Sequence, residues 1–171
     1  MIFRNQFLTI LLILVSIVAF SQNSEKEINE QVWKPFVKTL LSHDVEGFMN
    51  LHSKDVMRVE RDFRHILNYD QYKKDLNTSW PAWKQSMEVE KSKNTFELRF
   101  LERTANESQA FEVGYYKNEL INARGEKRTS YGQFHVALRK ENGVWKILVD
   151  SDSNNNRTIT EEMFQAAKAL E

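Results

Sequence analysis

The segment YGQFHVALRKENGVWKI, residues 131–147, decides the fold of this chain. Apolar residues alternate with polar or small ones over residues 134–138, which is the period of a β-strand with one buried face. Asn142 and Gly143 follow, and this pair readily adopts the positive φ angles that a two-residue hairpin turn requires. The segment therefore predicts an antiparallel hairpin whose second strand covers residues 144–149.

Upstream of this hairpin, two stretches show the same period of two. They are residues 96–101 and residues 111–116, with a polar link between them. A polar segment through Asn122 and Gly125 then leads to the hairpin. The four strands predict an antiparallel meander, and a weaker hairpin is expected over residues 56–67.

Three segments before the meander carry apolar residues at helical spacing. The first starts near Ile28 and contains Pro35, which predicts a kink or a helix that begins at that proline. Asp44 is expected to cap the second and Asp70 the third, and Pro81 is expected to end or bend the third. The sequence thus predicts an α+β fold in which helices cover one face of a curved antiparallel sheet.

Composition limits the possible functions. The 171 residues are enough for one domain, and 24 basic residues balance 24 acidic ones, so no nucleic acid or acidic membrane surface is expected as a partner. The chain has no cysteine, which excludes disulfides, a thiolate nucleophile and lipid attachment to a cysteine.

Residues 1–21 have the features of a signal peptide. An apolar run over residues 7–20 is shorter than a membrane-spanning helix needs, and Ala19 and Ser21 are small residues at the spacing that signal peptidase reads. Cleavage after Ser21 would release an exported protein, either periplasmic or secreted, whose only contact with a membrane is through the leader during export. The alternative is an uncleaved N-terminal anchor.

The segment from Asp150 to Glu161 has some of the spacing of a calcium-binding EF-hand loop. A loop that starts at Asp150 has Asn155 where glycine is needed, and a loop that starts at Asp152 has Met163 in place of the last glutamate. Neither register is complete, so no metal is predicted, and no other cofactor is expected. The favoured interpretation is a polar turn into a C-terminal helix within residues 158–171, capped by Thr158 or Thr160.

The opening KPFVKTLLSHDVEGFMNLHSKDV at residues 34–56, GYYKN at residues 114–118 and the segment quoted first resemble the nuclear transport factor 2-like superfamily. The resemblance is to its exported bacterial branch, related to polyketide cyclases and steroid isomerases, and it places the domain at residues 22–157. It implies a cone-shaped fold with an internal pocket and a homodimer formed through the open sheet face. It implies no particular activity, because members include isomerases, dehydratases and epoxide hydrolases, and no catalytic set of any branch is reproduced here.

Candidate site residues follow from residue type and position. A buried carboxylate or His52 could act as a general base, an arginine could pair with an anionic ligand, and aromatic residues could line an apolar cavity. Surface ion pairs and plain core packing are the ordinary alternatives for these residue types. The pocket candidates are His52, Arg58, Glu60, Tyr72, Trp80, Trp83, Glu112, Tyr115 and Asp150.

Three functional hypotheses fit these observations. The first is an exported pocket protein that binds a small, largely apolar molecule without converting it. The second is an enzyme of the isomerase, dehydratase or hydrolase type, which would require a carboxylate and a proton donor that converge in one cavity. The third is a homodimeric assembly module whose interior is filled by side chains.

Overall fold

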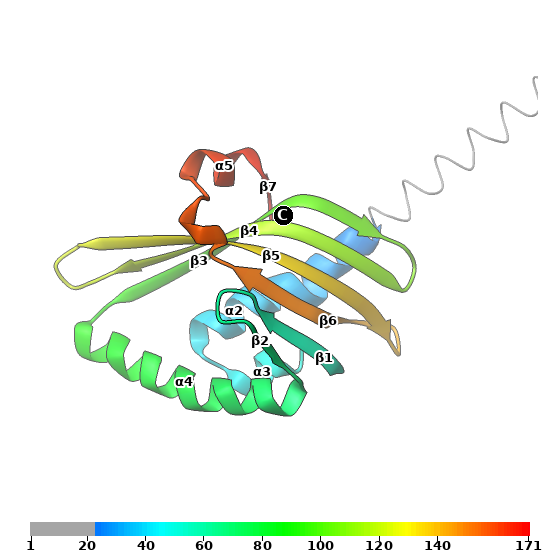
Figure 1. The fold of residues 1–171 in the computed structure, drawn as a ribbon, viewed down its shortest axis with the longest axis horizontal. Helices are drawn as coiled ribbons and strands as arrows, with labels where there is room; N and C mark the ends of the chain where they lie inside the picture. The colour runs from blue at the N-terminus through cyan, green and yellow to red at the C-terminus, as the bar shows by residue number, and fades with distance from the viewer. Residues whose placement is uncertain (1–22) are drawn as a thin grey trace, which may run out of the picture.

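A computed structural model describes residues 23–171 as one curved sheet with helices on both of its faces (Figure 1). The predicted signal peptide lies outside the described residues. The α2, α3 and α4 helices cover one face of the sheet, and α5 lies on the other (Figure 1). This arrangement confirms the predicted α+β cone. No described helix is both long enough and apolar enough to cross a membrane.

Seven strands form the sheet, in the order β2-β1-β6-β5-β4-β3-β7. Their bounds are β1 His52–Glu60, β2 His65–Leu67, β3 Lys93–Ala105, β4 Gln109–Ile121, β5 Lys127–Glu141, β6 Val144–Ser153 and β7 Lys168–Ala169. The predicted meander is β3 to β6, and Asn142 and Gly143 form its last turn with φ angles of 50° and 84°.

The prediction of a wholly antiparallel sheet is wrong at one pair, because β1 and β6 run parallel. A short hairpin connection forces two strands to be antiparallel, as it does for β1 and β2. No such connection joins β1 to β6, because strands β2 to β5 and helix α4 lie between them in the sequence. Their relative direction therefore depends on tertiary packing.

The helices differ from the prediction mainly at their ends. Their bounds are η1 Asn29–Trp33 (a π-helical turn), α2 Lys34–Ser42, α3 Val45–Met49, α4 Tyr69–Glu90, η2 Asn155–Arg157 (a 3-10 turn) and α5 Glu161–Ala166. Residues 23–28 are also helical, so the opening helix passes through the π turn and into α2, where Pro35 occupies the first turn. Pro35 lacks the N–H that would continue the regular helical hydrogen bonds, and the π turn, where the hydrogen-bond pattern changes, directly precedes this helix.

The α4 helix departs from the expected cap at Asp70 and from an end at Pro81, while the alternative that Pro81 bends the helix stays a prediction. Its N-cap is Asn68, which forms a capping box with Gln71, and Asp70 lies in the first turn instead. Pro81 does not end the helix, which continues to Glu90. Pro81 is exposed, so water can hydrate the carbonyl group that the missing N–H leaves unpaired. The other two caps are as predicted, with Asp44 on α3 and Thr160 on α5.

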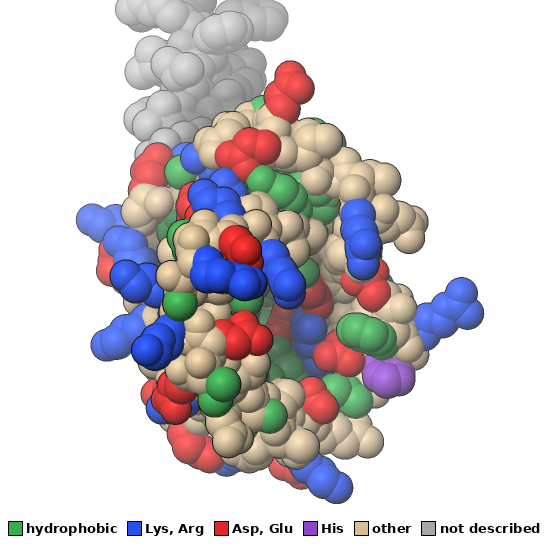
Figure 2. Space-filling view, turned by 90° about the vertical axis from the view of Figure 1, so that its left-hand side faces the viewer, with side chains coloured by type: hydrophobic (Ala, Val, Ile, Leu, Met, Phe, Trp, Pro, Cys, Tyr) green, Lys and Arg blue, Asp and Glu red, His purple; other side chains and the backbone are tan. Residues whose placement is uncertain are grey.

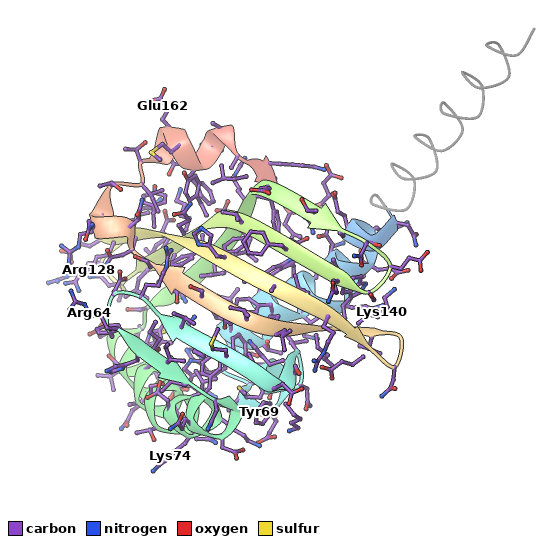
Figure 3. The ribbon with its side chains drawn as sticks, turned by 45° about the vertical axis from the view of Figure 1, so that its right-hand side comes forward. Arg64, Tyr69, Lys74, Arg128, Lys140 and Glu162 are labelled. Atoms are coloured by element: carbon purple, nitrogen blue, oxygen red, sulfur yellow. The ribbon has the colours of Figure 1, made fainter. Side chains whose placement is uncertain are left out.

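The core has two parts, one on each side of the sheet. The larger lies between the sheet and helices α2 to α4, and it includes the buried Trp33, Phe48 and Trp145. The smaller lies under α5, where Phe164 packs with Tyr115. The α5 helix turns its polar side to solvent, as Glu162 shows in Figure 3. The C-terminal residues thus cover part of the sheet's outer face.

Candidate functional site

The space between the helices and the inner face of the sheet contains a cavity of about 430 Å³. Figure 2 shows a hollow on one side of the molecule with acidic, basic and hydrophobic side chains in its wall. Nine of the 21 residues in the wall are aromatic. The aromatic residues that line it are Trp33, Phe36, Phe48, Tyr72, Trp80, Trp83, Phe96, Tyr116 and Phe134.

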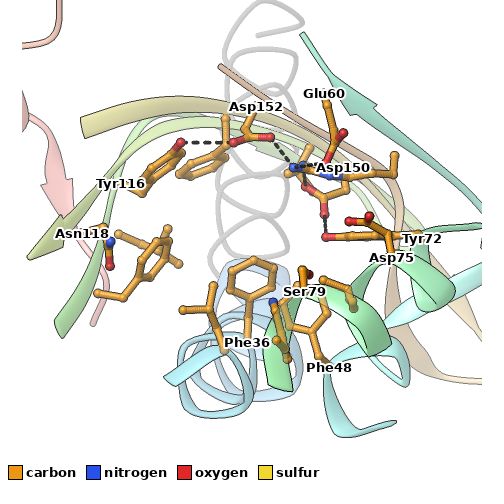
Figure 4. Close-up of a pocket in the computed structure, with 18 of the residues that line it drawn as sticks. Phe36, Phe48, Glu60, Tyr72, Asp75, Ser79, Tyr116, Asn118, Asp150 and Asp152 are labelled. Atoms are coloured by element: carbon orange, nitrogen blue, oxygen red, sulfur yellow. Dashed lines mark hydrogen bonds and ion pairs between the residues drawn. The ribbon is translucent and has the colours of Figure 1, made fainter. Parts of the chain in front are cut away.

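Arg58 is at the centre of a charged cluster in this cavity (Figure 4). The parallel pairing of β1 with β6 sets Arg58 opposite Asp150 and Glu60 opposite Asp152. The Arg58 Nη1 atom lies 3.2 Å from Asp150 Oδ1, and Nη2 lies 2.6 Å from Asp152 Oδ1. Glu60 is more distant, at 3.8 Å from Nη2. The two terminal nitrogens of the guanidinium group are therefore occupied by carboxylates of β6.

A β-bulge in β6 turns these carboxylates into the cavity. Ala137 of β5 pairs with Val149, but the next residue, Leu138, pairs with Ile147, so Leu148 is the extra residue. Strand alternation would otherwise keep the odd-numbered residues of β6 on the inner face. The bulge changes the inward set to even numbers, which brings Asp150 and Asp152 into the cavity.

Asp150 is buried, and two further side chains contact it. The Tyr72 hydroxyl donates to its Oδ2 at 3.0 Å, and His52 Nε2 lies 3.3 Å from the same oxygen. The Nδ1 atom of His52 donates to the Phe48 carbonyl oxygen at 3.0 Å, which fixes the ring. Burial opposes ionisation of Asp150, but Arg58 and the hydrogen bonds outweigh it and hold its pKa well below the usual range.

Asp152 has the opposite electrostatic balance. Its burial and the neighbouring Asp150 charge raise its pKa above the usual value, although Arg58 and Tyr116 act against the rise. The Tyr116 hydroxyl donates to Asp152 Oδ2 at 3.1 Å, as Figure 4 shows. Gly132 makes room for this ring, since a Cβ there would lie 2.1 Å from Tyr116 Cζ. The pKa values of these two carboxylates, which lie on one strand, are thus shifted in opposite directions.

These two shifts predict different effects for the same substitution. Asp150→Asn is expected to lower the free energy of unfolding by about 1–3 kcal/mol at pH 7, because Arg58 loses its most favourable partner. Asp152→Asn is expected to cost less than half as much, because an aspartate whose pKa is raised is already costly to ionise. The carboxylate of Asp150 stabilises the fold above its unfolded pKa of about 3.9, and this contribution is lost as the pH falls toward its folded pKa.

Urea unfolding of both variants and the wild type at pH 7, 5 and 3 measures these effects. The deficit of Asp150→Asn should be equal at pH 7 and 5 and smaller at pH 3. Equal deficits for the two variants at pH 7 would contradict the assignment of opposite shifts.

Six of the nine predicted site residues line the cavity. They are Arg58, Glu60, Tyr72, Trp80, Trp83 and Asp150. His52 lies behind Asp150 with a fully buried side chain, so it contacts the cluster but not the cavity. The idea that Arg58 pairs with an anionic ligand does not fit the structure, because Asp150 and Asp152 already neutralise it.

Two predicted pocket residues lie elsewhere. Glu112 is buried at another point of the core, where Arg103 Nη2 lies 2.7 Å from its Oε1 and the Trp33 indole donates to its Oε2. Tyr115 faces outward and packs under α5 with Phe164. Because neighbouring strand residues face opposite sides, Tyr116 and not Tyr115 reaches the cavity.

Sequence reasoning missed six polar residues in the wall. They are Asp75, Ser79, Tyr116, Asn118, Ser130 and Asp152. Tyr116 and Asn118 could have been predicted, because they follow Gly114 at every second position of β4 and so lie on the same face. Gly114 faces inward, where a Cβ would meet the Phe134 ring. Asp152 was read as part of a possible calcium loop, but it is a strand residue bound to Arg58. Residues 23–171 contain no group of three or more metal-ligating side chains placed to hold an ion.

Comparisons with known proteins find similar structures but no matching sequence. No protein-family model and no curated protein matches the chain. A conserved protein from Planctomyces limnophilus superimposes with a TM-score of 0.59 and 14% identity, over 76% of this chain and 94% of the other. An NTF-2-like protein of unknown function from Shewanella oneidensis gives 0.51 and 18%, over 72% and 93%.

A third similar structure is a protein from Xanthomonas campestris named for the association domain of calcium/calmodulin-dependent protein kinase II. It gives a TM-score of 0.52 and 15% identity, over 72% of this chain and 83% of the other. The helices on the inner face of a curved sheet define an α+β cone with an internal cavity. This chain has the nuclear transport factor 2-like fold, as the resemblance predicted.

Proposed function

We propose that the protein binds a small, largely apolar molecule in the aromatic cavity. The observation that carries the proposal is the cavity itself, which is large enough for a two-ring or three-ring molecule and is walled by nine aromatic side chains. It also argues against the alternative of an assembly module with a filled interior.

Two buried polar atoms suggest how such a molecule would be oriented. Arg58 Nε and Asn118 Oδ1 have no hydrogen-bond partner among the described residues, and both residues line the cavity. A buried polar atom without a partner is costly, so a ligand that satisfies either atom gains affinity from it. The ligand therefore has an apolar body and at least one polar group.

Removal of Trp83 is expected to weaken this binding about tenfold. Trp83 is half-buried in the cavity wall, so a ligand can pack against its ring, and the loss of such a contact costs about 1.4 kcal/mol. The fluorescent probe N-phenyl-1-naphthylamine should brighten on titration into the wild type, and Trp83→Ala should shift the midpoint. Phe63→Ala is the matched control, because Phe63 is 72% exposed and does not line the cavity. Equal affinity in the wild type and Trp83→Ala would reject the cavity as the binding site.

An enzyme is the second candidate, and one observation favours it. Asp152, with its raised pKa, and the Tyr116 hydroxyl lie together in the cavity, as acid–base catalysis requires. Against it, both tyrosine hydroxyls already donate to the aspartates, and the low pKa of Asp150 makes that carboxylate a weak base. Native mass spectrometry of the protein from its own host separates the two, since a bound molecule that is recovered unchanged after incubation supports binding alone.

We also propose that the protein is exported and forms a homodimer. Export rests on the leader sequence at residues 1–21, and the mature protein in the envelope fraction should begin at Gln22; a retained Met1 would reject cleavage. The dimer is proposed to use the part of the outer sheet face that α5 leaves uncovered. Met57 and Phe111 are each 43% exposed there, and His135 lies between β4 and β6 on the same face. Light scattering of the purified protein gives the oligomeric state.

A further inference from the structure

We infer that the polar group of the ligand is a cation with N–H donors, a protonated amine, held among the carboxylates and aromatic rings of the cavity. The inference rests on the proposed binding function and specifies its ligand class. It depends on three features of the cavity: its charge, the state of its donors and its aromatic wall.

The cavity carries an excess of negative charge. Four carboxylates line it, those of Glu60, Asp75, Asp150 and Asp152, and they face one guanidinium, that of Arg58. A proton on His52, behind Asp150, or on His65, 3.5 Å from Glu60, would each add one positive charge. Even with both, an excess of one negative charge would remain when all four carboxylates are ionised. A cation that enters the cavity compensates this excess, whereas an anion increases it.

The guanidinium group and the two tyrosine hydroxyls of the cluster, which would bind an anion, are already engaged. Both terminal nitrogens of Arg58 contact aspartates, and the hydroxyls of Tyr72 and Tyr116 donate to the same two side chains (Figure 4). An anionic ligand would have to break these contacts and leave a buried carboxylate unpaired, which is strongly unfavourable. The Arg58 Nε atom, a single N–H, is the buried donor without a partner in the cluster.

Acceptor atoms, in contrast, are available to a ligand. Asn118 Oδ1 is buried without a donor, and Figure 4 shows Asn118 in the wall below Tyr116. The side chains of Glu60 and Asp152 keep 21% and 26% of their surface exposed, so their oxygens can accept further hydrogen bonds. An ammonium group has N–H donors and no acceptor, and it matches this set.

The aromatic wall suits the same ligand. Faces of tryptophan and tyrosine attract a cation through the negative potential of the ring, and a desolvated site strengthens the attraction. Trp80 and Trp83 lie on α4 close in sequence to Asp75, and Tyr72 and Tyr116 are bonded to the two aspartates. The site therefore offers a carboxylate and a ring face to one charged group, with apolar wall left for the rest of the molecule.

Three probes of nearly equal shape test which ligand charge the cavity prefers. They are 2-(1-naphthyl)ethylamine, 2-(1-naphthyl)ethanol and 1-naphthylacetic acid. Isothermal titration at pH 7.5, where the amine is protonated and the acid ionised, gives each affinity. We expect the amine to bind at least tenfold more tightly than the alcohol, and the carboxylate most weakly. Equal or tighter binding of the alcohol or the carboxylate would overturn the inference and leave the proposed binding function in place. No binding of any probe would reject both.

The variant Glu60→Gln tests whether the Glu60 carboxylate contributes to the preference for the amine. It is expected to reduce amine affinity at least fivefold and to leave alcohol affinity within twofold, because the two side chains are alike in shape. Glu126→Gln is the matched control, since Glu126 is exposed and does not line this cavity. An equal loss for amine and alcohol in Glu60→Gln would indicate a structural defect and would contradict the assigned role of Glu60.

Discussion

Replacement of Arg58 by methionine is expected to destabilise the folded protein by about 3–5 kcal/mol at pH 7. The guanidinium group is the cation that contacts both Asp150 and Asp152. Its removal leaves the buried Asp150 and the partly buried Asp152 without the guanidinium group, and Tyr72 and Tyr116 cannot supply a positive charge. Breaking one side of a buried charged cluster is costly because the remaining charges stay desolvated.

The pH dependence of this variant follows from the sign of the new shifts. Without Arg58 the pKa of both aspartates rises in the folded state, so their ionisation opposes folding above that pKa. The deficit relative to the wild type should therefore shrink as the pH falls from 7 toward 4, where the aspartates become protonated.

Urea unfolding across this range measures the deficit of Arg58→Met. Arg58→Lys is the matched control: it keeps the charge but cannot bind two carboxylates with one planar group, so an intermediate loss is expected. If Arg58→Met lowered the free energy of unfolding by less than about 1 kcal/mol at pH 7, Arg58 would not form buried ion pairs with the two aspartates.

Replacement of Arg103 by methionine is expected to have a similar effect at a separate site. Arg103 contacts Glu112 through Nε at 2.8 Å and through Nη2 at 2.7 Å, and both side chains are buried. Burial already raises the pKa of Glu112 against the influence of Arg103 and Trp33. Loss of the arginine leaves an unpaired buried carboxylate, and we expect a loss of about 3–5 kcal/mol at pH 7.

A second substitution tests the cause of that loss. Glu112→Gln removes the charge and keeps an acceptor for the Trp33 indole, so the double variant Arg103→Met/Glu112→Gln should recover most of the stability. The single variant should also recover as the pH falls through the raised pKa of Glu112, because the protonated side chain is neutral. A double variant as unstable as the single one would mean that Arg103 acts through its other contacts, the hydrogen bond to Asn29 and the packing on the Phe100 ring.

The strands and caps were predictable because their signals are local. The turn at Asn142 and Gly143 and the cap at Asp44 depend on residues within a few positions of each other, and the structure confirms both. The C-terminal cap at Thr160 has the same origin. Pro81 shows the limit of such rules, since the α4 helix continues past it to Glu90.

The candidate site was predictable in part. Residue type alone selected Arg58, Asp150 and Tyr72, which the structure brings together from three elements. Type could not select between Tyr115 and Tyr116, because both lie in the same strand and only strict alternation assigns them to opposite faces. Glu112 was chosen as a pocket carboxylate, but its strand position places it beside Arg103, outside the cavity wall.

The sequence by itself determined the meander, the helices and their α+β class, because hydrophobic period and turn residues act over short distances. The tertiary structure alone decided which side chains meet. The parallel pairing of β1 with β6 places Arg58 beside Asp150, and the bulge at Leu148 turns Asp150 and Asp152 inward. The pairing joins residues 92 positions apart, and no local pattern specifies how such strands align. The bulge lies within the hairpin of β5 and β6, but the turn residues alone do not place it.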